Sequence, residues 1–140
     1  MLYFAYGSNL NKHQMHQRCP SAKLLSVGYL NGYTLYYGGE CIDWDNKAYL
    51  NIAKHDGGQV WGAVYQMSRA DIKRLDGFED VPRDYSRKLV RIHTGAKTLN
   101  AYVYLGHKVK RGVPSFKYRR TTLIGARADH LPKNYIASWL

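Results

Sequence analysis

The sequence is poor in several residue types, and each shortage excludes a class of protein. It has 2 cysteines among 140 residues, too few for the disulfide framework of a small secreted protein, and their spacing is not that of metal ligands. No apolar run approaches the ~18 residues that a transmembrane helix needs. The first residues lack the basic start and long apolar run of a signal peptide. We therefore expect a cytoplasmic protein with no membrane partner.

Acidic residues are also scarce. Asp and Glu number 10 against 21 Lys and Arg, which gives a formal net charge of +11. Residues 71–140 carry 15 basic and 6 acidic residues, whereas residues 1–70 carry 6 and 4. The run from Lys108 to Arg127 contains no acid and has Phe116 and Tyr118 among its cations, a weak nucleic-acid signature. The charge therefore indicates either an anionic partner or a solvated basic surface.

Aromatic residues, by contrast, are plentiful. They make up 14% of the chain, with 13 tyrosines, and 45% of all residues are hydrophobic. Such a chain can bury a core, and its length fits one domain over residues 1–140, because domains average about 150 residues.

Apolar runs and turn signals predict mostly short strands. Asn31-Gly32 and Asp56-Gly57-Gly58 are each typical of a tight hairpin turn. Ser68 begins an S-x-x-D helix start, and Gly77 is expected to end that helix. The expected strands are 2–6, two within 24–38, 48–54, 59–67, 86–93 and 99–105, and the expected helices are 10–18, 68–77 and 115–130. This order predicts an α+β fold, with a small barrel-like, mixed or antiparallel sheet flanked by a few helices.

The first candidate site follows the first strand, at Tyr6-Gly7-Ser8-Asn9-Leu10. Gly7 permits close backbone approach, and N–H groups before a helix can bind a carboxylate or an oxyanion. The plain alternative is a strand-to-helix turn in which Ser8 or Asn9 caps the helix. His13 and His16 share one helix face but have no third ligand, so we predict no metal site.

The second candidate is Glu79, one of only two glutamates, the other being Glu40. An apolar setting between Phe78 and Val81 would raise the pKa of the Glu79 carboxyl towards that of a useful general base. The adjacent Asp80 would act in the same direction. The alternative is a solvated acidic loop.

A third candidate is Tyr85, whose hydroxyl could orient a ligand. The alternative is one more buried tyrosine among the 13 of the chain.

Together these motifs resemble the gamma-glutamylcyclotransferase family, in the right order and over almost the whole chain. Tyr3–Leu10 resembles its signature loop, and Leu75–Glu79 its catalytic-glutamate segment. The other matching parts are Val60–Tyr65, Tyr85, Pro114-Ser115, Tyr118, Gly125-Ala126 and Leu131-Pro132 with Tyr135.

The resemblance implies a cofactor-free enzyme that cyclises a γ-glutamyl group to 5-oxoproline and releases an amine or amino acid. It implies Glu79 as general acid and base, and substrate binding by the following residues: Tyr6, Gly7, Ser8, Asn9, Leu10, Tyr85 and Tyr118. The expected partner is a small γ-glutamyl substrate, with a larger or anionic γ-glutamyl conjugate left open. The competing hypothesis is a non-catalytic module that binds nucleic acid or another polyanion through the basic C-terminal half.

Overall fold

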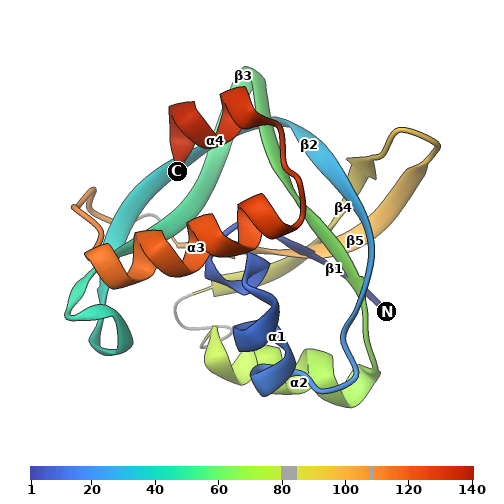
Figure 1. The fold of residues 1–140 in the computed structure, drawn as a ribbon, viewed down its shortest axis with the longest axis horizontal. Helices are drawn as coiled ribbons and strands as arrows, with labels where there is room; N and C mark the ends of the chain where they lie inside the picture. The colour runs from blue at the N-terminus through green and yellow to red at the C-terminus, as the bar shows by residue number, and fades with distance from the viewer. Residues whose placement is uncertain (80–84, 108) are drawn as a thin grey trace.

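Five strands close into a barrel, with helices packed around it, in the computed structural model, which describes residues 1–79, 85–107 and 109–140 (Figure 1). The elements in chain order are β1 (Leu2–Ala5), the 3-10 helix η1 (Ser8–Leu10), α1 (Lys12–Arg18), β2 (Lys23–Cys41), the 3-10 helix η2 (Ile42–Trp44), β3 (Lys47–Gln66), α2 (Arg69–Phe78), β4 (Tyr85–His93), β5 (Thr98–Gly106), α3 (Phe116–Ala128) and α4 (Lys133–Trp139). In the described residues, no helix is both long and apolar enough to cross a membrane.

The strand order around the barrel is β1-β3-β2-β4-β5, and β1 closes it by pairing with β5. The closing pair is parallel, at Tyr3 and Tyr102, whereas the other neighbours are antiparallel. Tyr3, Phe4 and Ala5 are all buried, so β1 has no solvent-facing side over these residues. The α+β barrel-like fold expected from the sequence is confirmed.

Both predicted hairpins within the first half of the sheet are wrong. β2 and β3 are single strands of 19 and 20 residues that pair antiparallel along almost their whole length. Asn31-Gly32 and Asp56-Gly57-Gly58 lie opposite each other, where the register shifts between Asn31 and Tyr33. Gly32 and Gly57 have the positive φ that those signals predict, but they form an irregularity between two strands and not two chain reversals.

The first two α-helices begin with side-chain caps, although not all at the expected residues. Asn11, and not Ser8 or Asn9, caps α1 by accepting a hydrogen bond from the Gln14 N–H at 3.2 Å. Ser68 caps α2 as predicted, accepting from Asp71.

Gly77 does not end α2 as predicted. A glycine that ends a helix in this way adopts a positive φ, and Gly77 does not. The helix runs on through Phe78, and Glu79 is its C-cap.

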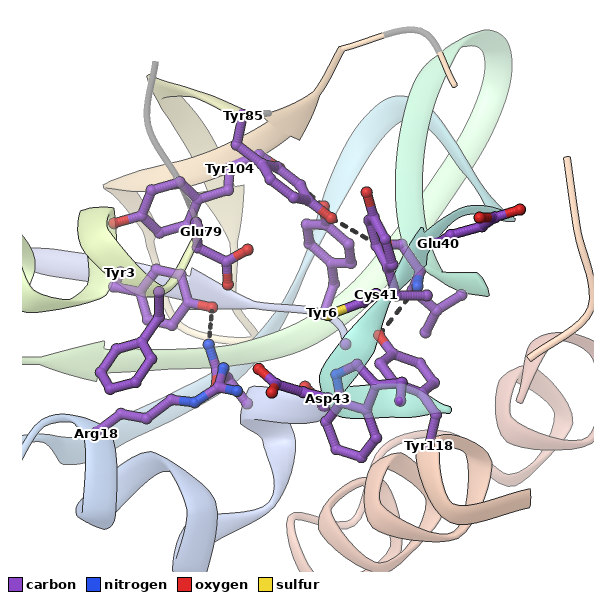
Figure 2. A pocket seen from close by; sticks show the side chains of 17 residues that line it. Tyr3, Tyr6, Arg18, Glu40, Cys41, Asp43, Glu79, Tyr85, Tyr104 and Tyr118 are labelled. Atoms are coloured by element: carbon purple, nitrogen blue, oxygen red, sulfur yellow. Dashed lines mark hydrogen bonds between the residues drawn. The ribbon is translucent and has the colours of Figure 1, made fainter. Parts of the chain in front are cut away.

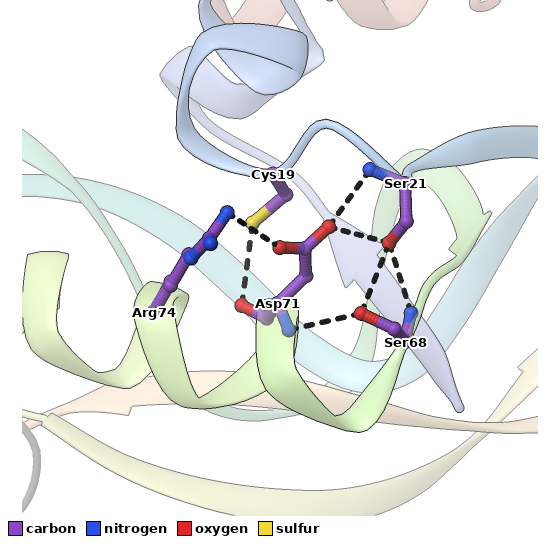
Figure 3. A network of polar contacts seen from close by, with 5 residues as sticks. All are labelled: Cys19, Ser21, Ser68, Asp71 and Arg74. Carbon is purple, nitrogen blue, oxygen red and sulfur yellow. Dashed lines mark hydrogen bonds and ion pairs between the residues drawn. The ribbon is translucent and has the colours of Figure 1, made fainter.

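A polar network around the buried Asp71 carboxylate fixes the start of α2 (Figure 3). The Asp71 carboxylate accepts hydrogen bonds from the Ser21 N–H, at 2.8 Å, and from the Ser21 hydroxyl, and it pairs with Arg74 at 3.2 Å. These bonds, the Ser21 hydroxyl foremost, lower the pKa of Asp71 below its usual 3.8 despite burial. The Cys19 thiol, itself buried, lies 3.3 Å from the Asp71 carbonyl oxygen. The network ties α2 to the segment that follows α1.

The helix α3 packs directly on η1, the turn that follows β1. Ser115 caps α3 by accepting a hydrogen bond from the Tyr118 N–H, and Gly125 lies where an added Cβ would be 2.2 Å from the Leu10 carbonyl carbon. Leu10 itself is fully buried. This contact holds the loop of residues 7–10, called the Gly7 loop below, between β1 and α3, at one end of the barrel.

Candidate active site

One cavity of about 120 Å³ contains most of the predicted site residues (Figure 2). Its wall comes from β1 and the loop after it, the end of α1, the end of β2 and start of β3 with the tip between them, the end of α2, and single residues of β4, β5 and α3. The lining residues are Tyr3, Tyr6, Gly7, Ser8, Asn9, Arg18, Glu40, Cys41, Asp43, Trp44, Tyr49, Leu50, Phe78, Glu79, Tyr85, Tyr104 and Tyr118. Every predicted site residue except Leu10 is among them.

The Gly7 loop has a backbone that is fixed by hydrogen bonds on several sides. The Gln14 amide donates to the Ser8 hydroxyl at 2.8 Å and to the Asn9 side-chain oxygen at 3.0 Å. The Leu10 N–H donates to the Gly7 carbonyl at 3.0 Å, so this N–H group serves the loop itself. The structure therefore places Leu10 in the core, and leaves Gly7, Ser8 and Asn9 at the cavity.

Gly7 is needed at its position because a neighbouring side chain approaches it closely. A Cβ on Gly7 would lie 2.8 Å from the Tyr118 hydroxyl. That hydroxyl accepts a hydrogen bond from the Leu50 N–H at 3.0 Å. A larger residue at position 7 would thus displace the Tyr118 ring from the cavity wall.

Glu79 points its carboxyl into the cavity from the end of α2 (Figure 2). Its own N–H donates to the Leu75 carbonyl at 2.9 Å, which extends the helical hydrogen bonding to this residue. Burial raises the pKa of Glu79 from 4.5 to about 7, while the nearby Arg18 guanidinium lowers it somewhat. A carboxyl with such a pKa can both accept and donate a proton near neutral pH. Asp80, expected to act in the same direction, lies outside the described residues.

Tyr6, Tyr85 and Tyr118 line the same cavity from three parts of the chain: the residue after β1, the start of β4, and α3. All three are less than a tenth exposed. The Tyr6 hydroxyl donates to the Tyr104 carbonyl at 2.8 Å. Burial raises the pKa of each of the three phenols above 10, so they remain protonated at neutral pH and act as neutral hydrogen-bonding groups.

Ten of the lining residues were not predicted as site residues from the sequence, and two of these, Arg18 and Tyr104, make specific contacts in the wall. Arg18 is the one cation among the described lining residues, and its guanidinium donates to the Asn9 side-chain oxygen at 3.0 Å and lies 5.0 Å from the Phe78 ring centre. Tyr104 places its ring in the wall, 5.7 Å from that of Tyr3. Neither stands in a local motif, and only the folded chain brings them to Glu79.

The two cysteines differ in burial, because Cys19 is buried, whereas Cys41 is partly exposed and lines the cavity.

The cations of the basic run contact other parts of the chain. Within the basic run, Lys108 lies outside the described residues. Arg111 lies over the ring of Tyr36, Lys117 lies over that of Trp44, and Arg119 donates to the Leu140 backbone oxygen. These three cations contact the chain's own residues.

Among the described residues, no group of three His, Cys, Asp or Glu side chains could hold a metal ion.

Comparison with known proteins identifies the family. The family described as "Gamma-glutamyl cyclotransferase, AIG2-like" matches residues 3–120. Gamma-glutamylcyclotransferases of Mus musculus and Homo sapiens are each 32% identical over 139 residues, which cover 96% of this chain and 74% of theirs. A solved structure described as "Gamma-glutamyl cyclotransferase" superposes with a TM-score of 0.94 at 30% identity, covering 99% of this chain and 85% of that one.

The chain therefore belongs to the gamma-glutamyl cyclotransferase, AIG2-like family. This confirms the resemblance and the prediction of an enzyme. The comparisons give no support to nucleic acid or an anionic conjugate as a partner. The roles of the individual site residues stay predictions.

Proposed function

We propose that this protein cyclises the γ-glutamyl group of a small substrate to 5-oxoproline and releases an amine or amino acid. The nitrogen of the substrate's α-amino group attacks its own γ-carbonyl carbon, and the bond from that carbon to the amide nitrogen breaks. One observation supports the proposal above all: a carboxyl group, Glu79, with a pKa of about 7, lies in a tyrosine-lined cavity beside the Gly7 loop.

Glu79 serves in turn as general base and general acid. As carboxylate it removes a proton from the α-ammonium group, which frees the attacking lone pair. As carboxylic acid it delivers that proton to the departing nitrogen. A proton transfer of this kind contributes roughly 10²–10⁴-fold to the rate. Because the nucleophile belongs to the substrate, the reaction needs no water and the enclosed cavity can exclude it.

The rest of the cavity binds and folds the substrate. Arg18 pairs with a substrate carboxylate, because Asn9 and Phe78 already hold its guanidinium at the wall. The N–H groups of the loop from Gly7 to Asn9 stabilise the negative oxygen of the tetrahedral intermediate. Tyrosine rings then keep the chain of the glutamyl group bent, with its amino nitrogen near the γ-carbon.

A small substrate is favoured over an anionic conjugate. Glu40 and Asp43 also line the cavity, and their carboxylates would repel a large anion. Three cations of the basic run make the intramolecular contacts described above, so we do not propose a polyanion partner. The cytoplasmic location stays a prediction.

The test is product formation, with a matched pair of glutamate variants. The purified protein is incubated with γ-glutamyl amino acids, γ-glutamyl amines and glutathione, and 5-oxoproline is followed by mass spectrometry. Glu79→Gln should abolish the product, whereas Glu40→Gln, at the exposed rim of the same cavity, should retain it. Turnover by Glu79→Gln at the wild-type rate would contradict the assigned role, and no product from any compound would contradict the activity.

A further inference from the structure

We propose that Asp76 is the positioning residue of the site: it ties the last turn of α2 to β5 through Tyr104 and to β4 through Arg87, and so holds Glu79 in the cavity. This inference rests on the proposed function, because it concerns the placement of the proposed acid and base.

The contacts of Asp76 are direct and bridge three elements. The Tyr104 hydroxyl donates to one carboxylate oxygen of Asp76 at 2.7 Å. The Arg87 guanidinium lies 3.1 Å from the other oxygen. Both side chains of this ion pair are only about a quarter exposed, at 27% for Arg87 and 24% for Asp76. Arg87 is in turn held over the Tyr102 ring, 4.7 Å from its centre. A carboxylate suits this position because one oxygen accepts the Tyr104 hydrogen bond while the other lies in an ion pair with Arg87.

Asp76 lies one helical turn before Glu79, on the part of α2 that decides where the carboxyl of Glu79 points. The hydrogen bond from the Glu79 N–H to Leu75 couples the two residues through one turn of backbone. Leu75 is fully buried and fixes the inner face of this turn, whereas Phe78 is 57% exposed. The polar tether at Asp76 therefore supplies a second fixed point, and two fixed points are needed to set the rotation of a helix end.

Tyr104 connects Asp76, which lies near the surface, to the wall of the cavity. Its ring lines the cavity, its hydroxyl bonds to Asp76, and its carbonyl accepts the hydrogen bond from Tyr6. A single residue of β5 thus connects the end of α2 with the residue that precedes the Gly7 loop. The proposed acid and base and the proposed binding loop are held at a fixed separation through it.

Loss of the tether should affect the chemical step and the titration of Glu79. A displacement of about 1 Å in a reacting group costs about 10²-fold in rate. Arg18 keeps its hydrogen bond to Asn9 when Asp76 is lost, and the Gly7 loop keeps its bonds from Gln14, so KM should change little. A carboxyl that moves outwards also gains water, so its pKa should fall from about 7 towards 4.5. Among the described residues, the ionisable groups that interact with Glu79 are Arg18, Tyr3, Tyr6, Tyr85, Tyr104 and Tyr118.

The chain allows this titration to be observed directly, because it contains only two glutamates. Glutamate labelled with carbon-13 at the side-chain carboxyl gives two resonances in NMR, and Glu79→Gln assigns them. The titration is compared in the wild type, Asp76→Ala, Asp76→Asn and Tyr104→Phe, together with kcat and KM for γ-glutamylalanine. Asp71→Asn is the matched control, because it removes a carboxylate from the first turn of the same helix.

We expect Asp76→Ala to lower kcat about 10²-fold with KM nearly unchanged, and to lower the midpoint of the Glu79 titration. Asp76→Asn keeps an acceptor for Tyr104 and should recover part of both effects. Adding Tyr104→Phe to Asp76→Ala should cost little more, because both remove the same bond. Asp71→Asn should lower stability but leave kcat and the titration unchanged.

The inference is overturned if Asp76→Ala titrates and turns over like the wild type, or if Asp71→Asn shifts both readouts equally. Should Asp76→Ala fail to fold, Asp76→Asn and Tyr104→Phe still test it. A shifted titration without 5-oxoproline from any protein would refute the proposed function and leave the positioning role in place. A wild-type Glu79 that titrates near 4.5 would refute the placement itself.

Discussion

Replacing Glu79 by glutamine should stabilise the folded protein at alkaline pH. In the folded protein the carboxyl remains protonated up to about pH 7, whereas in the unfolded chain it ionises above about 4.5. Folding therefore binds a proton in this range, and the free energy of unfolding falls as the pH rises from about 4.5 to above 7. The difference between the two pKa values corresponds to about 3 kcal/mol. Glutamine is neutral at every pH and avoids this loss.

The assay is urea unfolding of the wild type and Glu79→Gln at several pH values between 4 and 8. We expect equal stability near pH 4 and an advantage of about 3 kcal/mol for the variant at pH 8. Histidines also titrate in this range, but they are common to both proteins and cancel in the difference. Glu40→Gln, at an exposed residue, should follow the wild type. Parallel stability curves for Glu79→Gln and the wild type would refute the burial argument, whatever the enzyme activity.

Three further substitutions test the packing of the helices. Asp71→Asn should destabilise the protein by roughly 2 kcal/mol at pH 7. Since the folded-state pKa of Asp71 is lowered, that difference should vanish as the pH falls through it, which unfolding at pH 7 and pH 3 would reveal. Gly125→Ala should cost about 3 kcal/mol although alanine favours helix, because its Cβ would meet the Leu10 backbone. Gly77→Ala, in α2 with no atom within 4 Å of the new Cβ, should instead gain up to about 1 kcal/mol. Thermal unfolding of the two alanine variants tests this contrast, and equal shifts in their melting temperatures would contradict the packing.

Local signals predicted those elements whose ends are decided locally. Ser68 accepts the hydrogen bond that its S-x-x-D motif indicates, and the strands expected at 86–93 and 99–105 form an antiparallel pair. The turn signals Asn31-Gly32 and Asp56-Gly57-Gly58 led to wrong hairpin predictions, because a glycine with positive φ occurs in bulges as well as in turns. Whether such a glycine lies in a bulge or in a turn depends on which strand pairs with its own. A short stretch of sequence does not contain that information, because the paired residues are far apart in the chain.

The residues of the candidate site likewise divide into those that local motifs indicate and those that only the fold brings together. Glu79 and the Gly7 loop stand in recognisable segments, so they could be named from the sequence, and the cavity contains both. Arg18 and Tyr104 carry no local signal, because one arginine or tyrosine resembles another until the barrel closes. Asp76 lies within the Leu75–Glu79 segment, but the segment does not indicate that Asp76 contacts Tyr104 and Arg87. The tether between Tyr104 and Asp76 spans 28 residues of sequence, a distance that residue spacing alone does not bridge.

The length of the β2–β3 ribbon has a consequence for how this enzyme can change. An extended strand of 19 residues would measure roughly 60 Å, whereas a globular chain of this size has a radius of gyration of about 14 Å. The ribbon therefore bends, and its tip returns to the cavity with Cys41, Asp43 and Trp44. Glu79, the proposed proton-transferring residue, lies at the end of a separate helix, α2. Substitutions or insertions in the tip can therefore reshape the entrance without disturbing the reacting centre, so substrate choice and chemical step can be altered separately.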